Sequence, residues 1–185
     1  MSTRGSITFV IDSQEKTAYN HHDSYPEVLG DTVFSWLIGA ETDMDALRQA
    51  VRELRVVTPG SSPTTADIER VRQHDDIRVP ERTPEDWYGL LAETQGKPDL
   101  ILLAGIVEDV SDFPLNSVAC EWGYVVDLDA DTFEVYRGHQ DEPHEAGRFA
   151  ARANPEIGCY PIALVASWPL ADLPHHDAFL AQSRA

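Results

Sequence analysis

The sequence predicts an α+β protein with a mainly antiparallel sheet of about five strands. Two observations lead to this fold class. Apolar residues alternate with polar ones in two hairpin-like regions, one near the start of the chain and one in its second half. Between them stands a block of segments with helical spacing. Helices inserted between two hairpins are expected to pack on one face of the sheet.

Period-2 alternation predicts the strands, and turn residues bound them. Ile7, Phe9 and Ile11 alternate with smaller or polar neighbours, and residues 13–15 turn the chain. In the second hairpin, residues 129–131 supply the turn. The predicted strands are 6–12, 16–20, 118–128, 132–137 and 160–167.

Apolar residues at helical spacing predict the helices. The first helix has two candidate starts, Ser24, which has capping-box spacing to Glu27, and Asp31. Asp31 is preferred because Gly30 inside a helix would cost about 1 kcal/mol relative to alanine. Further predicted helices are 43–54 capped by Thr42, 65–73, 84–96 capped by Thr83, 98–104 ended by Gly105, a short one at 145–153 and a helical turn or two after Pro174.

The size and composition fit one globular domain. The chain has 185 residues, 42% of them hydrophobic, and at that length folding hides roughly 70% of the surface of the unfolded chain. No repeat or linker divides the sequence, so a single α+β domain is expected over residues 1–185.

The net charge is the unusual total. There are 32 Asp and Glu residues against 14 Lys and Arg, which gives a formal charge of −18. Such a field repels phosphates, so no nucleic-acid partner is expected. Mimicry of DNA is an alternative that the scattered acids do not favour.

With no signal-like start and no apolar run near the roughly 20 residues of a membrane span, a cytoplasmic protein with no membrane partner is expected. Its oligomeric state stays open.

No cofactor and no metal are expected. Cys120 and Cys159 are too few for a disulfide framework and match no zinc spacing. Residues 127–131 resemble the opening of a calcium loop, but Thr132 and Gly138 stand where that loop needs a glycine and an acid. A hairpin turn that carries acidic residues is the expected structure.

The densest polar segment is His21-His22-Asp23, followed by Ser24 and Tyr25. It falls where a strand gives way to a helix, and sites tend to lie on loops that such elements hold. A carboxylate next to an imidazole can orient the ring and raise its basicity. His21, His22 and Asp23 are therefore the candidate catalytic residues. The alternative is that Asp23 and Ser24 only hydrogen-bond the turn backbone.

Arg4, Tyr25 and Glu121 are the candidate ligand-binding residues. Arg4 precedes the first strand and His21 follows the returning one, so hairpin geometry brings Arg4 near His21 and Asp23. There it could hold an anion, or form an ordinary ion pair with Asp23. Glu121 lies on the strand face turned away from the apolar side chains. If that face is buried, Glu121 becomes a paired acid beside the site.

Three segments carry a resemblance to other proteins. They are Thr3-Arg4-Gly5, residues 19–26 (Tyr-Asn-His-His-Asp-Ser-Tyr-Pro) followed by Leu29-Gly30, and residues 121–129 (Glu-Trp-Gly-Tyr-Val-Val-Asp-Leu-Asp). The sequence resembles a group of hypothetical proteins of phages and soil bacteria over most of its length. The resemblance implies a phage or mobile-element context, and it implies no activity or substrate.

These features predict a small-ligand-binding protein, with hydrolysis as the candidate reaction, whose polar site lies at the junction of the first hairpin and the helix. The alternative is a non-catalytic acidic protein of phage type that blocks a host or defence protein. The first needs a concave site around Asp23, whereas the second needs a broad acidic or apolar face.

Overall fold

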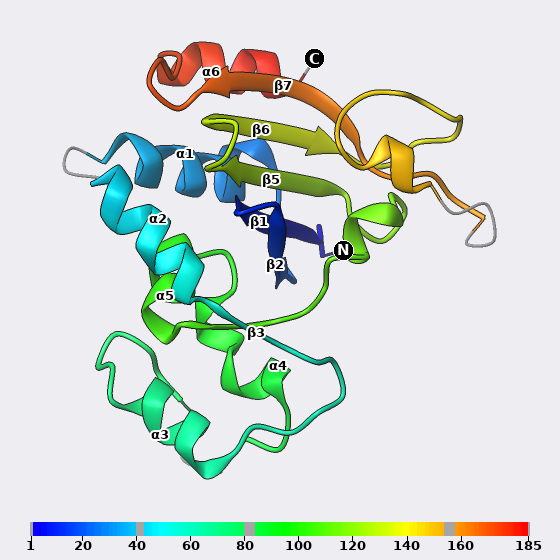
Figure 1. Cartoon of the computed structure of the whole chain (residues 1–185). Helices are drawn as coiled ribbons and strands as arrows, with labels where there is room; N and C mark the ends of the chain where they lie inside the picture. The colour runs from blue at the N-terminus through cyan, green and yellow to red at the C-terminus, as the bar shows by residue number, and fades with distance from the viewer. Residues whose placement is uncertain (1, 40–42, 80–83, 154–157, 185) are drawn as a thin grey trace.

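A five-stranded sheet forms the larger part of the molecule. The computed structural model describes residues 2–39, 43–79, 84–153 and 158–184. The strands lie in the order β2-β1-β5-β6-β7, with β2 and β7 at the two edges (Figure 1). Their bounds are β1 Gly5–Ile11, β2 Gln14–Asn20, β5 Trp122–Asp127, β6 Thr132–Arg137 and β7 Ala163–Pro169.

The sheet is mixed, although most of its pairs are antiparallel as predicted. The pairs β1–β2, β5–β6 and β6–β7 are antiparallel. The pair β1–β5 is parallel, with Gly5 opposite Trp122. Both hairpins therefore belong to one sheet, and the parallel pair at its centre joins them.

The helices begin and end close to the predicted positions, with two exceptions. They are α1 Asp31–Ile38, α2 Met44–Glu53, α3 Thr65–Arg72, α4 Trp87–Leu90, α5 Pro98–Ala104 and α6 His176–Ser183, with a π-helical turn η1 at Pro26–Gly30 and 3₁₀ turns η2 Ala92–Thr94, η3 Phe113–Leu115 and η4 Ala150–Arg152. The predicted helix 84–96 is divided into α4 and η2, and 145–153 keeps only η4. The predicted caps Thr42 and Thr83 lie outside the described residues, and Asp43 and Asp86 cap α2 and α4.

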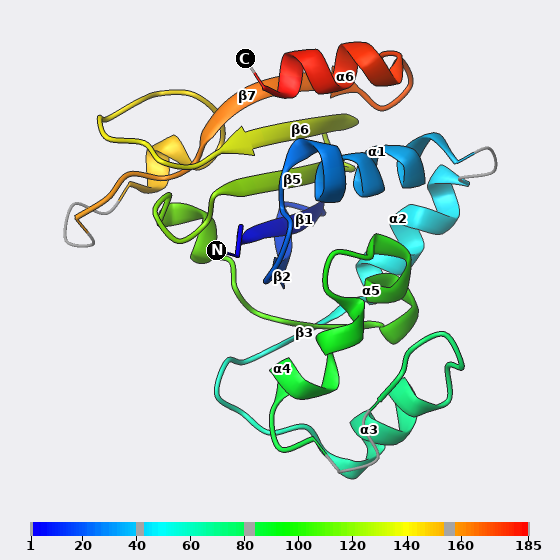
Figure 2. The ribbon, with the colours of Figure 1, turned by 180° about the vertical axis from the view of Figure 1, so that it is seen from behind.

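Helices cover one face of the sheet, as the sequence predicts. Seen from behind, α1 lies across the strands (Figure 2). The main hydrophobic core fills this interface, and Phe34 of α1 stacks on Phe179 of α6 with ring centroids 4.3 Å apart. A second cluster on the opposite face includes Val125, Tyr136 and Phe149. The central strands β1 and β5 are therefore buried on both faces.

A smaller lobe lies beyond the β2 edge of the sheet (Figure 1). It contains α3, α4 and a two-stranded parallel sheet of β3 Arg55–Val57 and β4 Ile106–Glu108, which the sequence analysis does not predict. Its own hydrophobic cluster includes Val71, Trp87 and Leu90. The lobe covers the β2 edge, which would otherwise present unpaired backbone groups.

Two cations, the buried Lys16 and the half-buried Arg148, reinforce the sheet. On the helix-covered face, the Nζ of Lys16 donates to the carbonyl oxygens of Val51, Arg52 and Leu54 at 2.7, 2.9 and 2.7 Å. On the other face, Arg148 binds the carboxylates of Asp127 and Glu134. Each cation thus has partners that replace the water it loses on burial.

Candidate functional site

The start of β1 brings three of the predicted site residues side by side. Gly5 lies opposite Asn20 of β2 and opposite Trp122 of β5. One residue earlier, Arg4 therefore falls between His21 and Glu121. The Glu121 amide donates to the Arg4 carbonyl at 2.9 Å, and the Arg4 amide donates to Glu121 Oε1 at 3.3 Å.

His139 extends this line of side chains on the far side of Glu121. Its Nε2 lies 3.5 Å from Glu121 Oε2. We refer to His21, Arg4, Glu121 and His139 as the polar row. It crosses one end of the four neighbouring strands β2, β1, β5 and β6, and it combines a cation, an acid and two imidazoles.

The junction after β2 is divided into a buried scaffold and an exposed face. Ser24 is fully buried. Its amide donates to the Thr3 carbonyl at 3.1 Å, its hydroxyl accepts from Asn20 Nδ2 at 2.8 Å, and its carbonyl accepts from the Tyr124 hydroxyl at 2.9 Å. A Cβ on Gly5 would lie 2.6 Å from Ser24 Cβ, so glycine is required there. Asn20 and Ser24 therefore hold the junction in place and are unavailable to a ligand.

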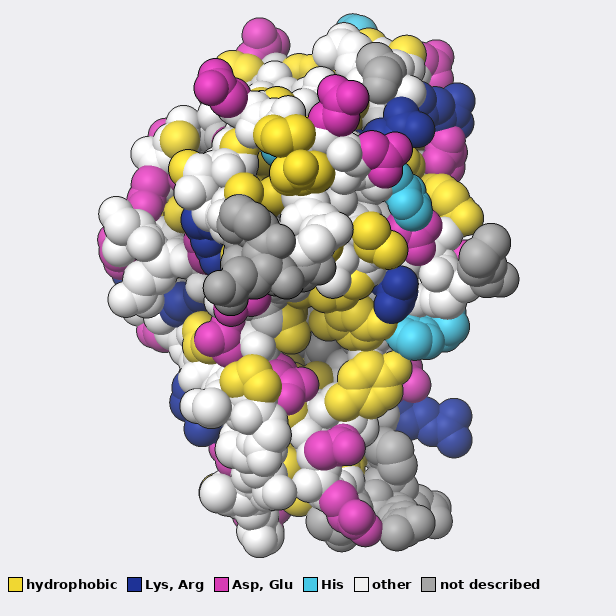
Figure 3. Space-filling view, turned by 90° about the vertical axis from the view of Figure 1, so that its right-hand side faces the viewer, with side chains coloured by type: hydrophobic (Ala, Val, Ile, Leu, Met, Phe, Trp, Pro, Cys, Tyr) yellow, Lys and Arg dark blue, Asp and Glu magenta, His cyan; other side chains and the backbone are white. Residues whose placement is uncertain are grey.

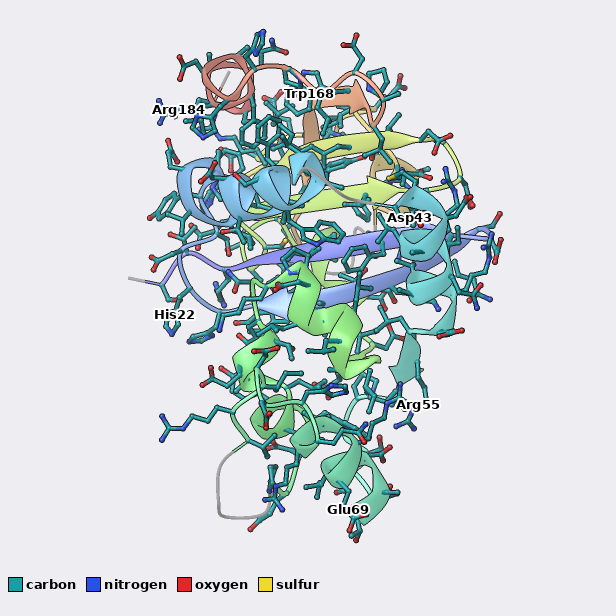
Figure 4. All side chains as sticks on the ribbon, turned by 90° about the vertical axis from the view of Figure 1, so that its left-hand side faces the viewer. His22, Asp43, Arg55, Glu69, Trp168 and Arg184 are labelled. Atoms are coloured by element: carbon teal, nitrogen blue, oxygen red, sulfur yellow. The ribbon has the colours of Figure 1, made fainter. Side chains whose placement is uncertain are left out.

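The two histidines of the junction are on the accessible side. His21 Nδ1 is 2.8 Å from the Tyr19 hydroxyl, and His22 Nδ1 is 2.9 Å from Ser2 Oγ. The two imidazole rings meet edge to face, with centroids 4.3 Å apart. Figure 4 shows His22 at the opposite end of the sheet from Asp43. Both imidazoles thus have one ring nitrogen fixed by a hydroxyl.

Asp23 and Tyr25 are exposed and stand apart from the polar row. Among the described residues, no hydrogen bond or ion pair joins the side chain of Asp23 to Arg4 or to either histidine, so the alternative of an Arg4–Asp23 pair is not observed. Tyr25 is 45% exposed. Asp23 has a left-handed backbone with φ of +52°, and its carbonyl accepts from the Leu29 amide at 3.3 Å.

This backbone conformation leads to a prediction for Asp23. Asp23→Asn is expected to leave the free energy of unfolding nearly unchanged, because asparagine also tolerates the left-handed region. Asp23→Ala should lower it by about 1 kcal/mol, since a Cβ without a local hydrogen-bonding group is disfavoured there. Urea denaturation of both variants measures the difference. An Asn variant as unstable as the Ala variant would contradict this account. If Asp23→Asn keeps the stability of the parent protein but loses ligand binding, Asp23 belongs to the site.

An aromatic wall, which the sequence analysis did not predict, borders the polar row. Tyr19 packs edge to face on Phe113 with centroids 5.2 Å apart, and its ring is 6.3 Å from that of Tyr88. Burial raises the pKa of Tyr19, and the nearby charge of Arg4 opposes that rise. Tyr88 is 49% exposed. The wall thus offers a ligand apolar surface next to the guanidinium of Arg4.

A larger cavity lies elsewhere in the described part of the chain. It measures about 670 Å³ and is lined by residues that include His144, Cys159 and Tyr160, none of which belongs to the polar row. His144 already uses both ring nitrogens, because Nε2 lies 2.9 Å from the Pro161 carbonyl and Nδ1 accepts from the Ala146 amide at 3.2 Å. This cavity therefore offers no free imidazole.

The thiol and metal chemistry of the site is limited. Cys120 is fully buried, and burial raises the pKa of its thiol to about 12, so its thiolate does not form near neutral pH. Among the residues that the structure describes, no three His, Cys, Asp or Glu side chains are grouped to hold a metal ion.

No helix in the same part of the chain is long and apolar enough to cross a membrane.

Comparisons with protein families, with curated proteins and with solved structures find no match to this chain. The geometry of the site is therefore the basis for its functional interpretation. That geometry consists of a cation, two accessible imidazoles and an aromatic wall at the end of the sheet.

Proposed function

We propose that the protein binds a small anionic ligand at the polar row, with Arg4 as the residue that holds the anion. The observation that carries this proposal is the state of the Arg4 side chain. It is half-buried, and within the described ranges its guanidinium has no acidic partner and no hydrogen bond. Arginines that pair with carboxylates in the same structure are Arg48, Arg52, Arg55, Arg148, Arg152 and Arg184.

An arginine in a chain of this composition has many possible carboxylate partners. Acidic residues outnumber basic ones by 32 to 14, so an arginine readily finds a carboxylate. Glu121 is adjacent, yet its Oε1 accepts from the Arg4 backbone amide and its Oε2 faces His139. The planar donors of Arg4 are thus left for a carboxylate or phosphate of a ligand. His21 and His22 add further donors on the same side.

Hydrolysis is the candidate reaction, because a hydroxyl and a base lie together at this site. Ser2 Oγ is 2.9 Å from His22 Nδ1, within the reach that proton transfer from a nucleophile needs. The hydroxyl also donates to the His21 carbonyl and must turn towards His22 to react. Turnover of nitrophenyl esters that is lost in both Ser2→Ala and His22→Gln supports this step. Equal turnover in either variant refutes it.

The ligand proposal predicts a specific loss in Arg4→Gln. A ligand that binds only the folded state raises the melting temperature, by an amount set by its concentration relative to Kd. Millimolar inorganic phosphate, acetate and butyrate are the probes. We expect at least one of them to stabilise the parent protein, and none to stabilise Arg4→Gln beyond the general salt effect seen with chloride.

Arg137→Gln is the matched control. Arg137 lies over the Trp122 ring at 5.9 Å and is also an arginine without a carboxylate partner in the described structure. Its variant should respond to the anions as the parent does. If no anion stabilises the parent, or if Arg4→Gln keeps the full response, the ligand proposal is wrong. In that case the cytoplasmic blocking protein of phage type becomes the better hypothesis.

A further inference from the structure

A narrow apolar cavity lies between the sheet and the smaller lobe, next to the polar row. It has a volume of about 40 Å³, and its lining includes Ala18 and Tyr19 of β2, Tyr88 and Leu91 of the smaller lobe, Val107 of β4 and Val110 just after β4. Figure 3 shows a hollow between the two parts of the molecule, with hydrophobic side chains in it and His and Lys/Arg side chains at its rim. We refer to this cavity as the apolar slot.

Two side chains belong both to the apolar slot and to the surroundings of Arg4. Tyr19 lines the slot, and its hydroxyl is 2.8 Å from His21 Nδ1. Tyr88 lines the slot as well, and its ring centroid is 6.4 Å from that of His21. The slot therefore opens beside the polar row, and one small molecule can contact both.

Two polar side chains of the lining, Thr94 and Gln95, have partners within the protein. Thr94 Oγ1 donates to the Leu91 carbonyl at 2.8 Å, and Gln95 Oε1 accepts from the His21 amide at 3.2 Å. Glu108 is the acidic residue of the lining, and its charge repels an anion. The slot thus suits an uncharged apolar group, while the anionic end of the same ligand is directed towards Arg4.

We propose that the apolar slot receives the aliphatic tail of a ligand whose anionic head binds Arg4. This inference rests on the proposed function and specifies its ligand class. A water-sized probe needs roughly 10–15 Å³ of such space, so the slot holds a tail of about three or four carbon atoms. The ligand class is a short-chain aliphatic carboxylate, with the carboxylate at the polar row and the chain between the lobes.

The test is a series of straight-chain carboxylates from acetate to octanoate, with Kd measured by titration calorimetry or chemical-shift perturbation. Burial of each additional methylene should lower Kd about fourfold, up to a chain that fills the slot, after which the gain should stop. Butanol and butylamine carry the tail without the anion, and both should bind at least tenfold more weakly than butyrate.

Variants of Val110 locate the tail. Val110 is half-buried at the slot, so Val110→Phe should fill the space and abolish the gain per methylene, while acetate still binds. Val110→Ala should enlarge the slot, so the affinity should continue to rise up to a longer carboxylate than in the parent protein. Val118→Phe, at a 61% exposed position outside the slot, is the control and should leave the series unchanged.

The outcomes separate this inference from the proposal on which it rests. If acetate binds in an Arg4-dependent manner but longer chains gain nothing, the apolar slot is not a tail site and the anion site stands. The same conclusion follows if Val110→Phe and Val110→Ala both keep the parent profile. If no carboxylate binds but phosphate does so through Arg4, the ligand class is wrong and the anion site again stands. If neither anion binds, both proposals fail.

Discussion

Replacing Arg148 with methionine is expected to lower the free energy of unfolding by about 3–5 kcal/mol at neutral pH, the usual effect of removing one partner from a buried ionic network. Arg148 donates to Glu134 through Nη2 at 2.9 Å and through Nε at 3.0 Å, and it also binds Asp127. The side chains of the two acids are only 13% and 8% exposed. Methionine fills much of the space but leaves both carboxylates without a cation.

The stability loss in Arg148→Met should depend on pH. Burial by itself would raise the pKa of Asp127, but hydrogen bonds from Arg148 and from the amides of Ala130 and Asp129 outweigh burial and lower it. A lowered pKa stabilises the parent above the unfolded value of about 4, and this stabilisation is lost as the pH falls through the folded value. Without Arg148 the buried carboxyl of Asp127 is protonated more easily, so the difference in unfolding free energy between variant and parent should narrow as the pH falls from 7 to 4.

Guanidinium denaturation at several pH values measures this difference. Arg48→Met is the control, because Arg48 pairs with the 61% exposed side chain of Asp131, and such surface pairs contribute about 0–1 kcal/mol. A loss in Arg148→Met no larger than that of the control would contradict the prediction. If the difference in unfolding free energy between Arg148→Met and the parent stays constant with pH, Arg148 stabilises the protein through packing and not through its charge.

Replacing Lys16 with methionine should cost about 3 kcal/mol of unfolding free energy. The ammonium binds three carbonyls, those of Val51, Arg52 and Leu54, where α2 ends. The last carbonyls of a helix have no partner within it, and each buried one left unpaired costs about 1–3 kcal/mol. Burial lowers the pKa of Lys16, and the charge of Asp12 opposes this shift only in part.

Lys97→Met is the matched control for Lys16→Met. The side chain of Lys97 is 49% exposed, and its Nζ lies 3.7 Å from Glu93. Its replacement should change the unfolding free energy by no more than about 0.5 kcal/mol. Urea denaturation compares the two variants. Equal stabilities would mean that water replaces the Lys16 ammonium at the end of α2 without cost.

Local signals were sufficient to predict most elements. The strand predicted at 132–137 has those bounds as β6, because alternating side chains and an acidic turn specify a hairpin within a few residues. Gly105 ends α5 with φ of +65°, as a glycine after an apolar helical run predicts. In both cases the determining residues are neighbours in the sequence.

Long-range pairing could not be predicted in the same way. The parallel pair β1–β5 joins segments more than a hundred residues apart, and neither strand indicates its partner. Strands β3 and β4 have three residues each, too few for a period to appear. The predicted helix 84–96 was wrong in its continuity, because Leu91, between α4 and η2, leaves the helical conformation with φ of −97° and ψ of 8°.

The candidate site could be predicted only in part, for the same reason. Arg4 lies beside His21 because hairpin strands return to their starting edge. Tyr88 and Phe113 reach Tyr19 through tertiary packing of separate segments. The polar segment after β2 also looked uniform in sequence, whereas the fold buries Ser24 and exposes His22. Burial separates the scaffold from the accessible face, and composition does not report it.

The parallel pairing of β1 with β5 also sets the order in which the molecule can assemble. The first hairpin ends at Asn20, but the edge of β1 that faces β5 has no partner until the chain has grown by another hundred residues, to Trp122. Glu121 stands 117 residues after Arg4, so the polar row cannot form until long after the first hairpin has been synthesised. Contacts of such sequence separation slow folding and leave strand edges open to other chains in the meantime. A nascent chain that stops before Glu121 contains the first hairpin and the smaller lobe, but two residues of the polar row, Glu121 and His139, have not yet been added.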